Sequence, residues 1–480
     1  MRRISALNSI LGLTWLLSAA LVGPATAATQ GLTILHDNDL HGHLRSFCYI
    51  EAVRGPREHC NVGGAARRAT LIRRLRARAT GPLMVVDAGD TTTRGALATT
   101  YEGIDEIEAM NAIGYDMAAV GNNEFKLEDG ADAQDAAGAQ EALERLVRRS
   151  RFPWLCANVT DAKGALLPGV EPFIVRQVGL VRVAFLGLTA PRSRLYPQTK
   201  GLIITDPIEA AKVWIPRARA EADVVVAVTH LGVIDDQLLV EQTRGIDAVI
   251  GGDSHTFLYE PLRVKNLDGM IVPIVQDGAF GVRLGEFRLV FRGDAASGWR
   301  LDHFTDRLIS IDESMTPDRQ ISDLVEGYAH PLDVDIGTAG KIGSTPAERR
   351  QLTAETLAHA WKSSAGTDVG LQREDDIYDA ISAHDVSLFA LQAVLPFHET
   401  VWRGQMSGAT LKQLLGKPTT YGGAVRSTIS QANVVETKTY SVAMTTFFAQ
   451  SILPGGEDTK EDSRLAAEHW LGGMAGQMLR

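Results

Sequence analysis

Carboxylates, imidazoles and an asparagine recur along the chain, each just after an apolar run. They are Asp39 and His41 in ILHDNDLHGH, Asp90 in VVDAGD, Asn122 in VGNNEF, His230 in VVAVTHLG, and Asp253 and His255 in VIGGDSH. Oxygen and nitrogen donors without a cysteine suit a hard or borderline divalent cation. Two such ions that share a carboxylate activate water and hold the attacking and leaving oxygens of a phosphoester displacement. The set therefore predicts a dimetal hydrolytic site.

The spacing within the pairs supports this prediction only when all the residues are taken together. Asp39-x-His41 places both side chains on one side of an extended segment, and Asp253-x-His255 repeats the arrangement. A lone Asp-x-His is more often a hydrogen-bonded loop, by about nine to one, and an aspartate after a strand is often a helix N-cap. Seven candidates at the ends of successive strands reverse those odds.

The elements that must position these residues are read from the apolar runs. The runs are continuous rather than alternating, which is typical of strands buried on both faces. Helical patterns lie between several of them, over 65–78, 104–114 and 207–222. Strands that alternate with helices predict an α/β architecture with ligands at the carboxyl edge of its sheets. A polar helix is expected near 313–333, a second α/β region from 334, and a solvated acidic loop over 455–463.

The N-terminal sequence predicts export. Residues 1–27 show the charged, apolar and small-residue order of a secretory signal peptide, with cleavage expected after Ala27. The apolar run is short for a membrane span and no later stretch is long enough, so a periplasmic or secreted chain without a membrane span is expected. In an oxidising compartment Cys48 and Cys60 could form a disulfide, with two unpaired thiols as the alternative. Cys156 lies in an apolar run and is expected in the core.

The charge distribution restricts the partners. A formal net charge of -10 argues against a nucleic-acid polymer, which requires a basic footprint. Six arginines do crowd residues 67–78, but an amphipathic helix with a solvated basic face explains them more simply than anion steering. A small-molecule substrate is the expectation.

These motifs, in this order, strongly resemble those of the calcineurin-like metallophosphoesterases and, within them, the bacterial periplasmic 5′-nucleotidase family. The segments LQAVLPFHETVWRGQMSGATLKQLL and KTYSVAMTTFFA resemble the family's C-terminal domain, so the resemblance covers nearly the full length. It implies an α/β fold with a four-layer αββα domain over 28–312, a linker helix over 313–333 and a smaller α/β domain over 334–480. In the family, that smaller domain binds the nucleoside part of the substrate.

The resemblance also implies a ligand set. Asp39, His41 and His255 would hold one metal, Asp90 would bridge, and Asn122, His230 and Asp253 would hold the other. The family usually has histidine where Asp253 stands, and the added oxygen favours manganese, with zinc, iron or magnesium as other candidates. A metal-bound hydroxide would be the nucleophile.

Two departures from the family pattern concern catalysis and substrate. The family has Gly-Asn-His-Glu-Phe-Asp where this chain has GNNEFK, so Asn123 replaces a general acid worth roughly 10²- to 10⁴-fold. Asn123 and His43 are the candidate catalytic residues; Lys126 could compensate, and His43 could instead support a ligand or face solvent. In the substrate loop, GLQREDDIYD lacks the family's Asn-Gly-Gly pattern and leaves Arg373 as the candidate substrate-binding residue.

The expected function is hydrolysis of phosphate esters, including 5′-nucleotides. One alternative is hydrolysis of a sulfur-sulfonate bond on a carrier protein, as in relatives that also depart at the catalytic histidine. A second alternative is a metal-containing binding protein without turnover. An assay on phosphate esters separates the first reading from the last.

Overall fold

The computed structural model describes residues 28–50, 58–125, 136–191, 199, 201–294, 297–419, 423–452 and 455–478. The predicted signal peptide and Lys126 lie outside these residues. None of the described helices is long and apolar enough to cross a membrane.

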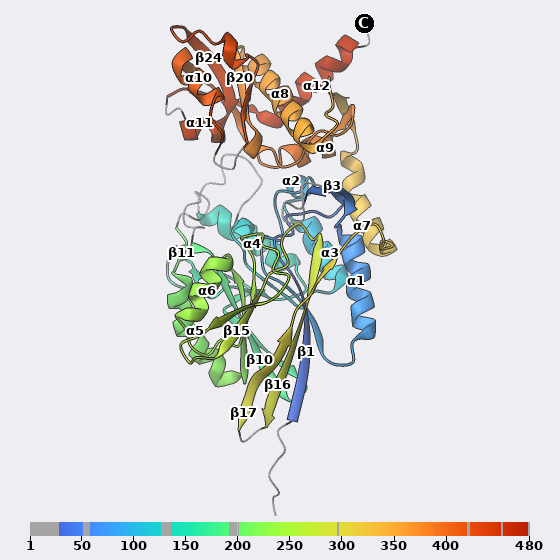
Figure 1. The fold of residues 1–480 in the computed structure, drawn as a ribbon, viewed down its shortest axis with the longest axis vertical. Coiled ribbons are helices and arrows are strands. Elements are labelled where there is room, and N and C mark those ends of the chain that lie inside the picture. Colours follow the sequence, from blue (N-terminus) through green and yellow to red (C-terminus); the bar gives the residue numbers. More distant parts are fainter. Residues whose placement is uncertain are drawn as a thin grey trace, which may run out of the picture.

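Two β-sheets face each other in the N-terminal body (Figure 1). The first has the order β17 (Gly298–Thr305), β16 (Arg283–Asp294), β1 (Ala28–Asp37), β4 (Leu83–Asp87), β5 (Met117–Ala119), β6 (Trp154–Leu155) and β8 (Val170–Glu171), with β18 (Leu308–Ser310) also on β16. The second has the order β14 (Leu262–Lys265), β15 (Ile271–Val275), β13 (Ala248–Gly251), β12 (Val224–His230), β10 (Val181–Thr189) and β9 (Phe173–Val178). Ile34, Val86, Phe185 and Val226 belong to one core between the sheets.

Helices cover the outer face of each sheet. On the first sheet lie α1 (Ala65–Arg78), α3 (Ile104–Ile113), α4 (Ala136–Arg149) and α7 (Arg319–Ala329), and on the second lie α5 (Pro207–Glu221) and α6 (Val233–Glu241). Because helices cover the outer faces and the sheets cover each other, the central strands are buried on both sides, which explains their unbroken apolar sequences. The predicted four-layer fold is confirmed.

The C-terminal body has one five-stranded sheet, in the order β23 (Val425–Ser427), β20 (Val369–Arg373), β24 (Thr439–Thr445), β22 (Thr400–Ser407) and β25 (Glu457–Asp462). The helices α8 (Pro346–Ala365), α9 (Leu388–Val394) and α12 (Ser463–Met478) contribute to one core cluster, and α10 (Gly408–Leu415) and α11 (Thr446–Ile452) to the other. The predicted acidic loop is wrong over β25, because that segment pairs with β22 as a charged edge strand.

The segment expected to link the bodies packs on the first of them. Ile321 and Val325 of α7 are buried in the same cluster as Ile72 of α1 and Ile107 of α3. A capping aspartate, Asp318, accepts from the amide of Ile321 and fixes where α7 begins. The predicted domain boundaries stay predictions.

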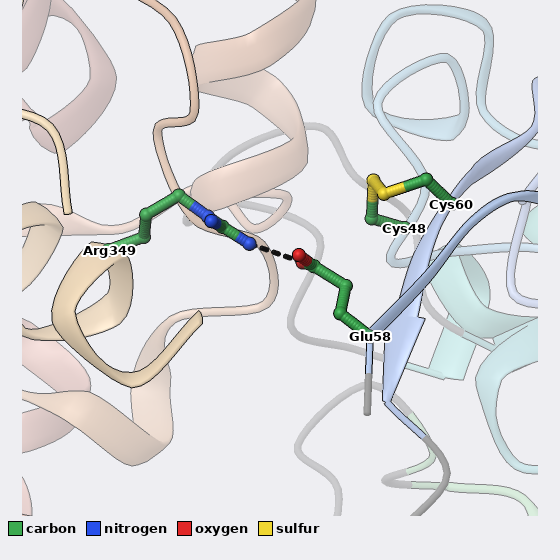
Figure 2. Close-up of a disulfide and its surroundings, with 4 residues drawn as sticks. All are labelled: Cys48, Glu58, Cys60 and Arg349. Carbon is green, nitrogen blue, oxygen red and sulfur yellow. Dashed lines mark hydrogen bonds and ion pairs between the residues drawn. A yellow bond between two sulfur atoms is a disulfide. The ribbon is translucent and has the colours of Figure 1, made fainter. Parts of the chain in front are cut away.

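A disulfide joins Cys48 of β2 (Phe47–Ile50) to Cys60 of β3 (Glu58–Val62), and Figure 2 shows it beside an ion pair between the bodies. In that pair, Arg349 of α8 donates to Glu58 of β3. Cys156 is buried and free, as expected.

The arginines of α1 differ from the prediction of a solvated face. Arg68 is only 1% exposed and pairs with buried Glu106, while its Nε lies 3.8 Å from Asp37 Oδ2. Arg73 pairs with Asp318 at the start of α7, and Arg74 is exposed as predicted. Arg68 and Arg73 therefore form ion pairs that join α1 to neighbouring elements.

Replacing Arg68 by alanine should destabilise the N-terminal body strongly. The change leaves Asp37 and Glu106 as buried acids without their cation, a loss that costs about 3–5 kcal/mol. Arg74→Ala is the matched control on the same helix, with an expected change below about 0.5 kcal/mol. Urea denaturation followed by circular dichroism measures both, and equal free energies of unfolding would contradict the assignment.

Candidate metal centre

The seven predicted ligands gather at one edge of the N-terminal body. Asp39 and His41 follow β1, Asp90 follows β4, Asn122 follows β5, His230 ends β12, and Asp253 and His255 follow β13. The parallel pairing of β1 with β4, of β4 with β5, and of β12 with β13 brings these carboxyl ends together.

The first group of candidate ligands is Asp39, His41 and His255. Asp39 Oδ1 lies 3.2 Å from His255 Nε2 and 3.6 Å from His41 Nε2, and the two Nε2 atoms are 3.1 Å apart. Three donor atoms therefore converge on one point, as the resemblance implied for the first metal.

The second group is Asp39, Asp90 and His230. His230 Nε2 lies 3.2 Å from Asp90 Oδ2, 3.8 Å from Asp39 Oδ1 and 3.6 Å from Asp253 Oδ1. The side-chain amide of Asn122 donates to Asp253 Oδ1 at 3.1 Å, and its oxygen accepts from Asn123.

The backbone beneath these side chains is left-handed. The φ angles are 52° at Asp39, 49° at His41, 55° at Asp90, 79° at Asp253 and 53° at His255. Non-glycine residues adopt this region rarely, and such outliers cluster at functional sites. The expectation that Asp39 and His41 share one side of an extended segment is wrong, because β1 ends at Asp37 and a turn presents both.

Residues outside the predicted ligand set hold the candidate ligands in place. Asn38 Nδ2 and the amide of Asp253 each donate to Asp39 Oδ2 at 2.7 Å, so Oδ1 is left facing the histidines. Glu124 accepts from the amides of Asp90 at 3.1 Å and Gly121 at 2.7 Å. Both Asn38 and Glu124 stand inside the motifs HDNDLH and GNNEF, so the sequence did carry a signal for them.

Two of the candidate histidine ligands differ in charge. The Nδ1 of His230 lies 2.8 Å from the carbonyl of Ala88, which turns Nε2 toward the carboxylates. Burial lowers the pKa of His230, but the charges of Asp90 and Asp39 outweigh it and raise that pKa to about 9, so a metal ion bound there would displace the Nε2 proton. Burial, followed by the charge of Arg94, lowers the pKa of His41 well below its ordinary value and favours the neutral ring. Burial raises the pKa of Asp90, but the charge of His230 outweighs it and leaves that pKa well below its usual range.

Two buried atoms test whether cations fit here. Asp39 Oδ1 and His230 Nε2 are inaccessible to solvent and make no well-aligned hydrogen bond among the described residues, although His255 Nε2 and Asp90 Oδ2, respectively, lie 3.2 Å from them. An unsatisfied buried polar atom costs about 1–3 kcal/mol, whereas a coordinated cation satisfies it. The residues therefore fit two divalent ions.

The geometry also offers a second candidate for the bridging carboxylate. Asp39 belongs to both groups of ligands. Both oxygens of Asp90 accept from Asn123, Oδ1 from its amide at 2.8 Å and Oδ2 from its side chain. The bridging role of Asp90 stays a prediction beside this alternative.

The other predicted site residues are engaged elsewhere, and their roles stay predictions. Asn123 donates to Asp90 from the first position of η2 (Asn123–Phe125). His43 Nδ1 lies 3.1 Å from the carbonyl of Leu40, and burial lowers its pKa to about 4. Arg373 makes two 2.7 Å hydrogen bonds to Asp376, so its charge is neutralised within its own loop.

Asp39→Asn and Asp90→Asn should each lower the number of metal ions bound. An amide keeps the shape of the carboxylate but removes the charge that holds a divalent cation, so fewer than two manganese ions per chain are expected. The exposed acid Asp235, replaced by asparagine, is the control and should keep the wild-type count. Elemental analysis after dialysis measures the stoichiometry; wild-type metal content in both site variants would refute the ligand assignment.

Comparison with known proteins agrees with this geometry. The family description "Calcineurin-like phosphoesterase" matches residues 32–257, and "5'-nucleotidase, C-terminal domain" matches 336–431. The human 5'-nucleotidase is 32% identical over 300 residues, which cover 58% of this chain and 50% of that protein. The bovine 5'-nucleotidase is also 32% identical, over 57% of this chain and 48% of its own length. The chain thus spans about half the length of these relatives.

Solved structures share the fold over most of the chain. A 5'-nucleotidase precursor from Thermus thermophilus has a TM-score of 0.72 at 23% identity and covers 93% of this chain and 97% of its own. The sulfate thiohydrolase SoxB of Thermus thermophilus has a TM-score of 0.68 at 18% identity, covering 92% and 94%. The two matches identify a calcineurin-like phosphoesterase domain followed by a 5′-nucleotidase C-terminal domain in this chain, and the solved structures share its fold.

Proposed function

We propose that this protein is a dimetal hydrolase of phosphate esters, with 5′-nucleotides among its substrates. The observation that carries the proposal is the pair of ligand groups that share Asp39, with Asp39 Oδ1 and His230 Nε2 buried and without a well-aligned hydrogen bond among the described residues. The relatives named 5'-nucleotidase support the substrate class.

The chain's own residues would position the reaction. Asp39, His41 and His255 would form one binding group and Asn122, His230 and Asp253 the other, with Asp90, or alternatively Asp39, shared between them. The two divalent ions, with manganese favoured by the carboxylate of Asp253, would supply Lewis acidity for the attacking water and for the phosphate charge. Glu124 and Asn38 hold the ligand loops, so that little reorganisation is needed when the substrate binds.

The side chain at position 123 should limit the substrates that turn over fast. Asn123 can donate a hydrogen bond but cannot transfer a proton, and its amide is committed to Asp90. A departing oxygen must then take its proton from solvent. Esters with good leaving groups should therefore react faster than esters of ordinary alcohols.

An exported location fits the same proposal. The sequence over 1–27 reads as a signal peptide, and the Cys48–Cys60 disulfide is of a kind that persists in oxidising compartments. We place the protein in the periplasm or outside the cell. The likeness to SoxB concerns the fold, and the comparisons give no support to a carrier-protein partner.

The direct test is an activity assay on the chain from residue 28, loaded with Mn²⁺. We expect hydrolysis of p-nitrophenyl phosphate and of AMP, weaker hydrolysis of bis-p-nitrophenyl phosphate, and at least 10³-fold less in Asp39→Asn, on the order of the rate that metal activation supplies. Asp235→Asn should match the wild type. A chain with two bound metals that hydrolyses none of the three esters would sink the phosphatase proposal and favour a binding protein.

Restoring the family's acid tests the role of Asn123. The double variant Asn123→His with Lys126→Asp should raise kcat on AMP by roughly 10²-fold or more, because the histidine can protonate the leaving oxygen. On p-nitrophenyl phosphate, whose leaving group needs no proton, the gain should be small. An equal gain on both substrates, or none on AMP, would show that a missing acid does not limit this chain.

A further inference from the structure

Arg94 is a cation fixed beside the metal centre that neither the motifs nor the ligand set includes. It lies on the loop after β4, with a left-handed φ of 66°. Two contacts hold that loop against the ligand turn. The amide of Gly42 donates to the carbonyl of Thr91 at 3.0 Å, and Gly95 packs so tightly that a Cβ there would lie 2.2 Å from the Gly42 carbonyl oxygen. The loop that carries Arg94 is therefore fixed against the turn that carries Asp39 and His41.

The charge of Arg94 acts on the centre. Next after burial, it lowers the pKa of His41, and it contributes to the low pKa of His43 and of Asp90. Its guanidinium also reaches toward the C-terminal body, where its Cζ lies 5.8 Å from the ring centroid of Tyr378. The side chain of Arg94 therefore faces Tyr378, in the segment where the resemblance places the substrate loop, while its charge still influences His41 and Asp90.

The contacts of Arg94 differ from those of other arginines near the junction of the bodies. Arg45 pairs with Glu326 and Asp333, Arg349 with Glu58, and Arg373 with Asp376. Within the described part of the chain, no carboxylate pairs with Arg94, and its buried Nε has no hydrogen-bond partner there. A guanidinium placed in this way offers several N–H donors to an anion at the centre.

We propose that Arg94 binds the non-bridging oxygens of the substrate's phosphoryl group and stabilises the charge that develops as the leaving oxygen departs. The inference rests on the proposed function and names a residue for it. In the step, the attacking water releases a proton to solvent, its oxygen forms a bond to phosphorus, and the bond from phosphorus to the leaving oxygen breaks. The electron pair goes to the leaving oxygen, which takes a proton from solvent. Arg94 donates hydrogen bonds in this step and transfers no proton.

Arg94 would thus place a positive charge at the phosphoryl group, in a site where Asn123 replaces the family's proton-donating histidine. Asn123 is committed to Asp90, His43 faces the carbonyl of Leu40, and Arg373 is neutralised by Asp376. None of the three offers a free positive charge to the phosphoryl group. The competing explanation is a structural one, in which Arg94 only joins the two bodies through the ring of Tyr378.

Binding of inorganic phosphate separates these explanations without requiring turnover. Isothermal titration calorimetry on the Mn²⁺-loaded chain should give at least tenfold weaker phosphate binding for Arg94→Gln, and a smaller loss for Arg94→Lys, which keeps the charge but not the fork of donors. Arg319→Gln, at a side chain 95% exposed on α7, is the control and should match the wild type. Elemental analysis should find two metal ions in every variant.

Two further measurements complete the test. In the same preparations, kcat/KM on p-nitrophenyl phosphate should fall by roughly 10²- to 10³-fold in Arg94→Gln, as for other lost oxyanion donors. Tyr378→Ala should keep phosphate binding within threefold of the wild type. Unchanged phosphate binding in Arg94→Gln, or an equal loss in Tyr378→Ala, would overturn the inference. If the wild type hydrolyses no ester, the proposed function fails while the phosphate titration still decides the role of Arg94.

Discussion

The carboxylate of Asp39 is the constraint on which the rest of the site depends. It follows the first strand of one sheet, yet its Oδ2 is held by the backbone amide of Asp253, which follows a strand of the other sheet. The carbonyl of Asp39 in turn accepts from the amide of Phe280 at 2.7 Å. Because these bonds occupy one carboxylate oxygen and the backbone, the other oxygen points at three imidazoles. The two sheets pack through an apolar core, and the loops after their strands therefore meet at Asp39 Oδ1.

Much of this could be predicted from the sequence, because each strand that feeds the site is buried on both faces and leaves an unbroken apolar run. The helix over 65–78 has its predicted bounds, since its apolar stripe is regular. The strand β25 was not foreseen, because residues such as Glu457 and Lys460 lie at an edge with one hydrogen-bonded neighbour and no apolar alternation. The burial of Arg68 was not predicted, because Asp37 and Glu106, the acids near its guanidinium, come from distant parts of the chain.

The candidate ligands were predicted as a set of residues whose roles stay predictions, but the geometry that brings them together was not predicted. A period-two argument placed Asp39 and His41 on a strand, whereas left-handed turns present them. Such turns depend on tertiary hydrogen bonds, for example from the amide of His41 to the carbonyl of Asp90 at 3.0 Å. The spacing of residues within the segment around His41 does not show that its amide bonds to Asp90, which is distant in the sequence. For the same reason, no pattern in the sequence marked Arg94 as a neighbour of the ligands.

The hairpin closed by Cys48 and Cys60 has a consequence for how the protein matures. Its strands place Phe47 and Tyr49 against Phe280, with ring centroids 6.4 and 6.0 Å away, and Phe280 packs 5.3 Å from the ring of His255. The same hairpin carries Glu58, the partner of Arg349 in the other body (Figure 2). One covalent bond thus stabilises both the aromatic rings that pack against the candidate metal ligand His255 and a contact to the C-terminal body. Formation of this disulfide should therefore be a step in assembling the candidate site, so chain produced where thiols stay reduced has all the candidate ligands but lacks the bond that holds these rings in place.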